Sequence, residues 1–155
     1  MTSNEESKTV FEDVKINIKT KLSALWAAFM FLYVYDVLLS LYEPGRIEEL
    51  MTGSIDGVEF TPELLFGSAI LITIPSLMVF LALILKPAVN RWVNIVLGIV
   101  YILVNITNVL SSPNLWAYLF VFYIIEGVLS ALIVWHAWRW PTLERRPESS
   151  SGDLN

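Results

Sequence analysis

The sequence of 155 residues lacks cysteine entirely and contains a single histidine, His136. The absence of cysteine excludes disulfide bonds, thiol catalysis and cysteine-ligated metals or clusters. The sequence also lacks a nucleophile triad, a phosphate-binding loop and a metal-binding motif, so it predicts no cofactor. His136 lies among tryptophans at the end of an apolar run. We expect it to anchor the chain at a membrane interface, within an inner aromatic belt that includes Trp26.

Charge is also scarce, because only 16% of the residues are charged and none of them falls in residues 64–85 or 92–125. A soluble helical bundle keeps a charged outer face on each helix, which disfavours that class of protein. A bilayer core about 30 Å thick is crossed by roughly 20 apolar residues in helical conformation. The sequence therefore predicts an all-α protein, a four-transmembrane-helix bundle in the lipid bilayer. The predicted spans are residues 22–42, 62–85, 92–110 and 115–138.

The lysines and arginines predict the orientation of these spans. Nine of the ten lie in the N-terminal tail, the second connection or the C-terminal end, and only Arg46 lies in the first connection. Basic residues favour the cytoplasmic side, so we expect a cell-membrane protein with both termini in the cytoplasm (N-in/C-in). No basic patch suggests a nucleic-acid partner.

The tails are predicted to lie outside the membrane domain of residues 22–140. In the tail of residues 1–21, Thr9 and Glu12 fit a helix-capping box, and a short amphipathic helix on the inner membrane surface is favoured over a strand. The tail of residues 141–155 is polar and rich in serine, so we expect it to be disordered.

The first connection is the one long loop between spans. It predicts a short helix over residues 46–52 that stops at Gly53, followed by a turn at Asp56-Gly57. Thr61 then suits the N-cap of the second span. This loop is either a plain connector or a lid over the outer mouth of the bundle.

Two acidic residues, Asp36 and Glu126, fall inside the predicted spans. Ionisable groups in hydrocarbon are costly and usually face the interior of a bundle. No lysine or arginine within the spans neutralises them, so we expect each to carry a proton or to meet water or a bound cation. Tyr33 lies three residues before Asp36, and Tyr123 lies three residues before Glu126, so each pair shares one helix face.

The third span adds a polar stripe at helical spacing, which should face inward and consists of Asn94, Gly98, Tyr101, Asn105, Asn108 and Ser112. The 1.5 Å rise per residue places Tyr101, Thr73 and Glu126 near the bilayer middle, with Asp36 and Asn105 about 6 Å nearer the outside. We therefore predict one polar pocket that begins at mid-depth and opens outward. The candidate ligand-binding residues are Asp36, Glu126, Tyr101, Asn105, Tyr33, Tyr123, Asn108 and Thr73. In the alternative interpretation these groups bond to one another and fix the helix register.

Three functions follow from these patterns. The leading hypothesis is a non-enzymatic membrane protein whose pocket binds or passes a small molecule, an ion or a proton. The first alternative is a membrane enzyme acting on a lipid or isoprenoid, with Asp36 and Glu126 as acid and base. The second is a structural or accessory membrane subunit. Small residues four apart, such as Gly127 and Ala131, are compatible with a homo-oligomer.

Four stretches together carry a family resemblance. They are MFLYVYD at 30–36, PGRIEELMTG at 44–53, NRW at 90–92 and IVWHAWRW at 133–140. Over residues 22–140 the chain resembles the small four-span prokaryotic membrane proteins grouped as domain of unknown function six-three-two-six. The resemblance implies a four-helix integral membrane fold, with Asp36 among the matching residues, and brings no substrate, activity or cofactor. The layout is also similar to the DoxX-like four-helix proteins, an analogy that transfers no function.

Overall fold

The computed structural model describes residues 15–111 and 116–141. Its elements are α1 (Ile18–Ser40), α2 (Arg46–Thr52), β1 (Ser54–Ile55), β2 (Val58–Glu59), α3 (Pro62–Ile84), α4 (Pro87–Ser111) and α5 (Ala117–Trp138). The predicted capping box of Thr9 and Glu12 and the predicted disorder of residues 142–155 lie outside the described residues.

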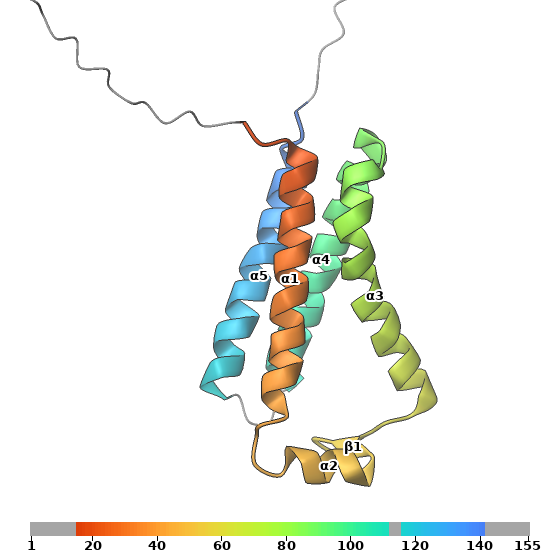
Figure 1. The fold of residues 1–155 in the computed structure, drawn as a ribbon, viewed down its shortest axis with the longest axis vertical. Helices are drawn as coiled ribbons and strands as arrows, with labels where there is room; N and C mark the ends of the chain where they lie inside the picture. The colour runs from red at the N-terminus through yellow and green to blue at the C-terminus, as the bar shows by residue number, and fades with distance from the viewer. Residues whose placement is uncertain (1–14, 112–115, 142–155) are drawn as a thin grey trace, which may run out of the picture.

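The four long helices α1, α3, α4 and α5 are each long and apolar enough to cross a membrane. They confirm the predicted all-α membrane fold and run alongside one another in Figure 1. We call the end that carries α2 and the β1–β2 hairpin the loop end. We call the opposite end, where α1 begins and α5 ends, the tail end. The N-in/C-in orientation stays a prediction.

Helix α1 begins at Ile18, four residues before the predicted span. Asn17 has extended backbone and is its N-cap, because its side-chain oxygen accepts a hydrogen bond from the Lys19 backbone N–H at 2.9 Å. This bond satisfies one of the free N–H groups at the helix start. Large apolar side chains on the outer faces, such as Phe31, Phe66 and Leu110, are exposed, which suits contact with lipid.

The helices do not pack in chain order. Helix α1 packs against both α3 and α5, and α4 packs mainly against α5. Helices α3 and α4 are consecutive but touch little, and Figure 1 shows α3 diverging from the other helices toward the loop end. Pro75 lies inside α3, where it removes one backbone hydrogen bond.

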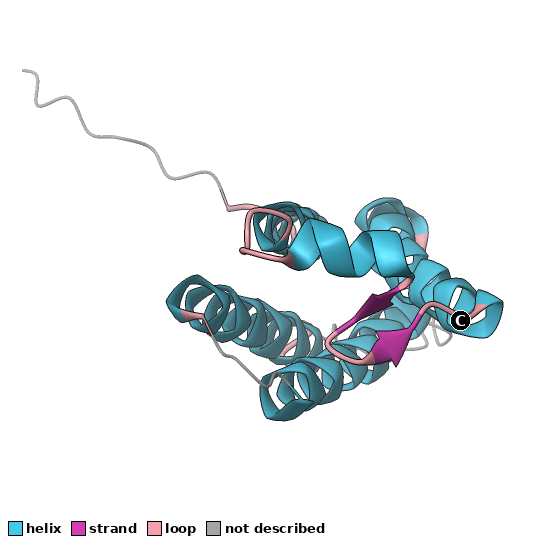
Figure 2. Ribbon diagram, turned by 90° about the horizontal axis from the view of Figure 1, so that it is seen from below, coloured by secondary structure: helices cyan, strands magenta, loops and turns pink. Residues whose placement is uncertain are grey.

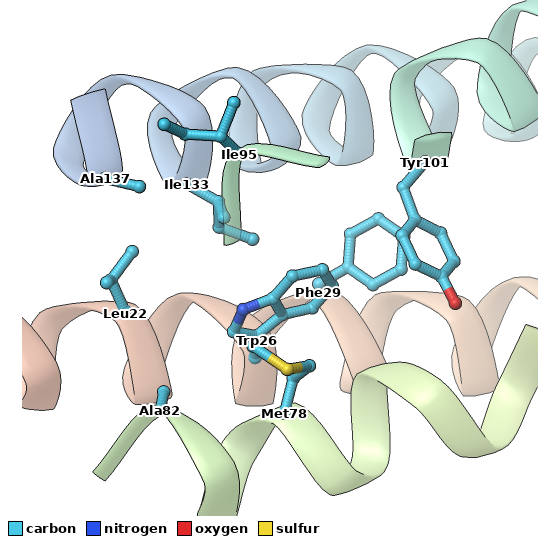
Figure 3. Close-up of a cluster of buried hydrophobic side chains, with 9 residues drawn as sticks. All are labelled: Leu22, Trp26, Phe29, Met78, Ala82, Ile95, Tyr101, Ile133 and Ala137. Carbon is cyan, nitrogen blue, oxygen red and sulfur yellow. The ribbon is translucent and has the colours of Figure 1, made fainter. Parts of the chain in front are cut away.

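The buried apolar core joins all four long helices (Figure 3), and most of its members lie in the helix halves nearer the tail end. Its members are Leu22, Trp26, Phe29, Met78, Ala82, Ile95, Tyr101, Ile133 and Ala137. The Trp26 and Phe29 rings each meet the Tyr101 ring edge-to-face, with centroids 5.6 and 5.2 Å apart, an arrangement that aromatic rings favour. The assignment of Trp26 to an interfacial belt is wrong, because its side chain is fully buried.

The first connection folds as its sequence predicts. Helix α2 ends at Thr52, and its C-cap is Gly53, whose φ of 81° is left-handed. Strands β1 and β2 form an antiparallel hairpin, visible beside α2 in Figure 2. Its turn residues Asp56 and Gly57 both have positive φ, at 50° and 79°, as a two-residue type I′ turn requires. The Thr61 hydroxyl caps α3 by accepting from the Leu64 N–H at 3.2 Å.

Candidate functional site

A pocket of about 300 Å³ lies at the loop end, between α1, the first connection and the start of α5. It is lined by Asp36, Val37, Ser40, Glu43, Pro44, Arg46, Glu49, Ile55, Asp56, Trp116, Leu119 and Tyr123. Asp36 and Tyr123 are therefore the two predicted site residues that line it. The other charged lining residues come from the first connection, so the loop forms one wall of the pocket.

Arg46 connects the acidic residues of this wall. Its guanidinium donates to Glu43, to Asp56 at 3.0 Å and to Glu49 at 3.4 Å. Burial lowers the pKa of Arg46, but its hydrogen bonds to Glu43 and Asp56 outweigh burial and leave the pKa above its ordinary value. The second oxygen of Glu43 accepts a hydrogen bond from the Tyr118 hydroxyl on α5. The Glu43 carboxylate therefore links the first connection to α5, because it accepts hydrogen bonds from both Arg46 and Tyr118.

Asp36 differs from these loop carboxylates because it makes no ion pair with Arg46 in the described structure. It lies on α1 and is half-buried, and its Oδ1 atom is buried without a hydrogen-bond partner among the described residues. A buried oxygen without a partner carries the cost of lost hydration. A donor or a cation entering the pocket would remove that cost.

Glu126 lies deeper on α5 and does not line the pocket. Its side chain is 3% exposed, and its Oε2 accepts from the Asn105 amide nitrogen on α4 at 3.1 Å. Its Oε1 is buried without a partner among the described residues. Glu126 and Asn105 are therefore predicted residues that meet directly, across α5 and α4. Tyr33 is half-buried on α1, and its ring stacks on that of Phe29 with centroids 6.5 Å apart.

Tyr101 serves a different part of the bundle. Its hydroxyl donates to the Leu71 carbonyl on α3 at 2.6 Å, and in Figure 3 it points away from α4 toward α3. In a regular helix the Leu71 carbonyl would accept from the N–H of residue 75, but Pro75 has none. Tyr101 thus satisfies the carbonyl that the proline leaves free, as membrane helices require.

The remaining predicted residues are placed differently from one another. Thr73 is exposed on the surface of α3, whereas Glu126, which was predicted to lie at the same depth in the membrane, is buried in the bundle. Asn108 is half-buried on α4, one turn toward the loop end from Asn105. The loop-end pocket is therefore lined by predicted residues of α1 and α5 only, and the predicted residues of α3 and α4 lie outside its lining.

A second polar system lies toward the tail end. The Trp26 indole N–H donates to Asn94 Oδ1 at 2.7 Å, and Asn94 donates to Asn90 Oδ1 at 2.6 Å. Asn90 in turn donates to the Ala82 carbonyl near the end of α3 at 2.6 Å. These buried bonds link α1, α4 and α3, as the register-fixing interpretation of the asparagine stripe expects. Asn90 and Trp26 were not predicted to take part, because periodicity alone does not identify partners.

Sequence analysis also missed the loop residues that build the pocket wall, namely Glu43, Arg46 and Asp56. Their one available signal was the concentration of acidic residues around a single arginine in the first connection. Among residues 15–111 and 116–141, no group of three or more histidine and acidic side chains is placed to hold a metal ion. The polar and aromatic groups that line the loop-end pocket are four carboxylates, one guanidinium, the Ser40 hydroxyl and two aromatic side chains.

Comparison with known proteins gives one match. The model of a family described as "Family of unknown function (DUF6326)" matches residues 9–145. This match confirms the resemblance carried by the four sequence stretches. Searches of curated proteins and of solved structures returned no significant match. The likeness in layout to the DoxX-like proteins stays a prediction.

Proposed function

This chain belongs to the family of unknown function DUF6326, and we propose that its loop-end pocket binds a small organic cation. The observation that carries this proposal is the charge of the lining. Four carboxylates, of Asp36, Glu43, Glu49 and Asp56, face one guanidinium, that of Arg46. Three of the four share that guanidinium, so Asp36 is the carboxylate available to an incoming positive charge.

The size and the aromatic lining favour an organic cation over a bare ion. A volume of about 300 Å³ lies at the lower end of the range for small-molecule pockets and far exceeds a single ion. Trp116 and Tyr123 line the pocket beside Asp36, and aromatic faces attract alkylammonium groups. A protonated or quaternary amine can interact with both the Asp36 carboxylate and the aromatic rings.

Binding is favoured over passage across the membrane. Beyond Glu126 the interior is filled by the apolar core around Trp26 and Ile133, both fully buried (Figure 3). A continuous polar path through that half of the bundle would require these side chains to move apart. The proposal therefore places the ligand at the loop end, with Glu126 below it as a buried carboxyl oriented by Asn105.

The two alternatives gain less support. An enzyme that uses Asp36 and Glu126 as acid and base needs both within reach of one substrate, and Glu126 does not line the pocket. A purely structural subunit predicts a bundle without a cavity, and the pocket argues against it.

The proposal is tested with the full chain in lipid nanodiscs. Tetramethylammonium, choline and putrescine are titrated calorimetrically, with glycerol and acetate as neutral and anionic comparators. We expect at least one cation to bind, and Asp36→Asn to weaken that binding about tenfold, since hydrogen bonds to charged groups contribute roughly 1.5–3 kcal/mol. The matched control is Glu48→Gln, which removes an acidic charge from α2 outside the pocket lining. If no cation binds, or if both variants weaken binding equally, the proposed site is wrong.

A further inference from the structure

A basic concavity lies at the tail end, opposite the loop-end pocket. It has a volume of about 550 Å³ and is lined by Lys15, Ile16, Asn17, Ile18, Lys19, Lys21, Pro87, His136, Trp140 and Pro141. It is formed where the start of α1, the start of α4 and the end of α5 meet. Among residues 15–111 and 116–141, no acidic side chain is part of this lining, in contrast to the loop-end pocket.

The basic groups of this tail-end pocket are not equally engaged. The Lys19 ammonium donates to the Leu83 and Leu85 carbonyls at 3.2 and 2.7 Å, so it caps the end of α3. Lys15 and Lys21 are exposed and show no acidic partner among the described residues. These two ammonium groups are therefore available to an anion.

His136 adds a directed group to the same wall. Its Nδ1 lies 2.8 Å from the Leu132 carbonyl oxygen, and a carbonyl only accepts, so Nδ1 carries a hydrogen. In the neutral ring the other nitrogen, Nε2, can then only accept a hydrogen bond. The single histidine thus has a backbone partner, the Leu132 carbonyl, at the end of α5 where the sequence predicts an interfacial anchor.

We propose that the tail-end pocket holds the phosphate-bearing headgroup of an anionic phospholipid. The pocket lies at the ends of membrane-spanning helices, the depth at which lipid headgroups are found. Its lining combines lysines with apolar and aromatic side chains, among them Ile16, Ile18 and Trp140. A phospholipid carries a charged phosphate next to hydrocarbon, so it can contact both the lysines and the apolar side chains. A free phosphate ion can contact the lysines alone. Clustered basic residues beside a span are the usual recognition element for such lipids.

The test uses the full chain in a neutral detergent, where no charged bilayer surface contributes. Phosphatidylglycerol, phosphatidylcholine and inorganic phosphate are titrated separately, and bound ligand is measured by native mass spectrometry. We expect phosphatidylglycerol to bind most tightly. We expect the double variant Lys15→Gln/Lys21→Gln to weaken it about twenty-five-fold, at about fivefold for each lysine. Both lysines are exposed, so the variant is expected to keep the wild-type thermal midpoint.

Lys86→Gln is the matched control, because Lys86 is an exposed lysine at the same end that is not part of the pocket lining. Its affinity for phosphatidylglycerol should stay within about twofold of the wild-type value. Equal losses in the control and in the double variant would show only general attraction and overturn the proposal. Equal binding of the two lipids would also overturn it. Inorganic phosphate binding as tightly as phosphatidylglycerol would replace the lipid by a soluble anion.

Discussion

The hydrogen bond between Tyr101 and the Leu71 carbonyl offers a sharp test of how this bundle holds its kinked helix. Tyr101→Phe removes one hydroxyl and leaves the ring, which is 4% exposed, in its aromatic cluster. The Leu71 carbonyl then loses its tyrosine donor. It gains no backbone donor in exchange, because Pro75 has no N–H. Lipid hydrocarbon offers no replacement donor.

The magnitude follows from two limits. Interhelical hydrogen bonds in membranes contribute about 0.6 kcal/mol on average and up to about 1.7 kcal/mol. Leaving a buried acceptor without a partner costs about 1–3 kcal/mol. Since both apply to Leu71, we expect Tyr101→Phe to lower the free energy of unfolding by about 1.5 kcal/mol, roughly a tenfold change in the folding equilibrium. Helices α3 and α4 touch little elsewhere, so few other contacts compensate.

The assay is reversible unfolding in mixed micelles by increasing the fraction of denaturing detergent. A double-mutant cycle with Pro75→Ala isolates the cause, because alanine restores an N–H that can donate to the Leu71 carbonyl. In the Pro75→Ala background, Tyr101→Phe should cost less than half of its cost in the wild-type background. Tyr35→Phe, at an exposed tyrosine of α1, is the control and should change nothing. Equal costs of Tyr101→Phe in both backgrounds would refute the reasoning.

Three further substitutions address other contacts. Asn94→Ala breaks the buried polar chain near the tail end and should lower the free energy of unfolding by about 1–3 kcal/mol, measured in the same micelles. Gly98→Ala would place a Cβ 2.6 Å from Val134 Cγ2, and because the valine side chain is stiff we expect the free energy of unfolding to fall by about 1–3 kcal/mol. Gly67→Ala is the control, since nothing lies near its added Cβ and it should not lower the free energy of unfolding. Equal effects of the two substitutions would contradict this. Arg46→Ala leaves three carboxylates facing one another, so limited proteolysis should cut the first connection faster than in the wild type.

Much of the fold was predictable because its signals are local. Long apolar runs predict the spans, and Gly53, Asp56-Gly57 and Thr61 predict where the loop elements begin and end. The inward direction of Asn94 and Asn105 also follows from spacing along one helix, and both are buried. These features depend on neighbours in the chain and not on how the helices meet.

The site was less predictable because it depends on rotation and tilt between helices. Depth along the membrane normal grouped Thr73 with Glu126, but α3 turns Thr73 to the surface. Tyr101 was assigned to the pocket, yet its hydroxyl meets a backbone carbonyl that no side-chain pattern reveals. Arg46 enters the pocket wall because the loop folds back onto the helix ends, which hydropathy does not encode.

The spatial order of the helices, with α1 between α3 and α5, bears on how the chain assembles during synthesis. Spans emerge from the ribosome in sequence order, so α1 and α3 can pair while the rest of the chain is still being made. Helix α4 enters the bilayer next to a helix that it barely touches, and its main neighbour is the last span to arrive. We therefore expect a chain truncated before α5 to keep its first pair and to leave α4 exposed to membrane quality control.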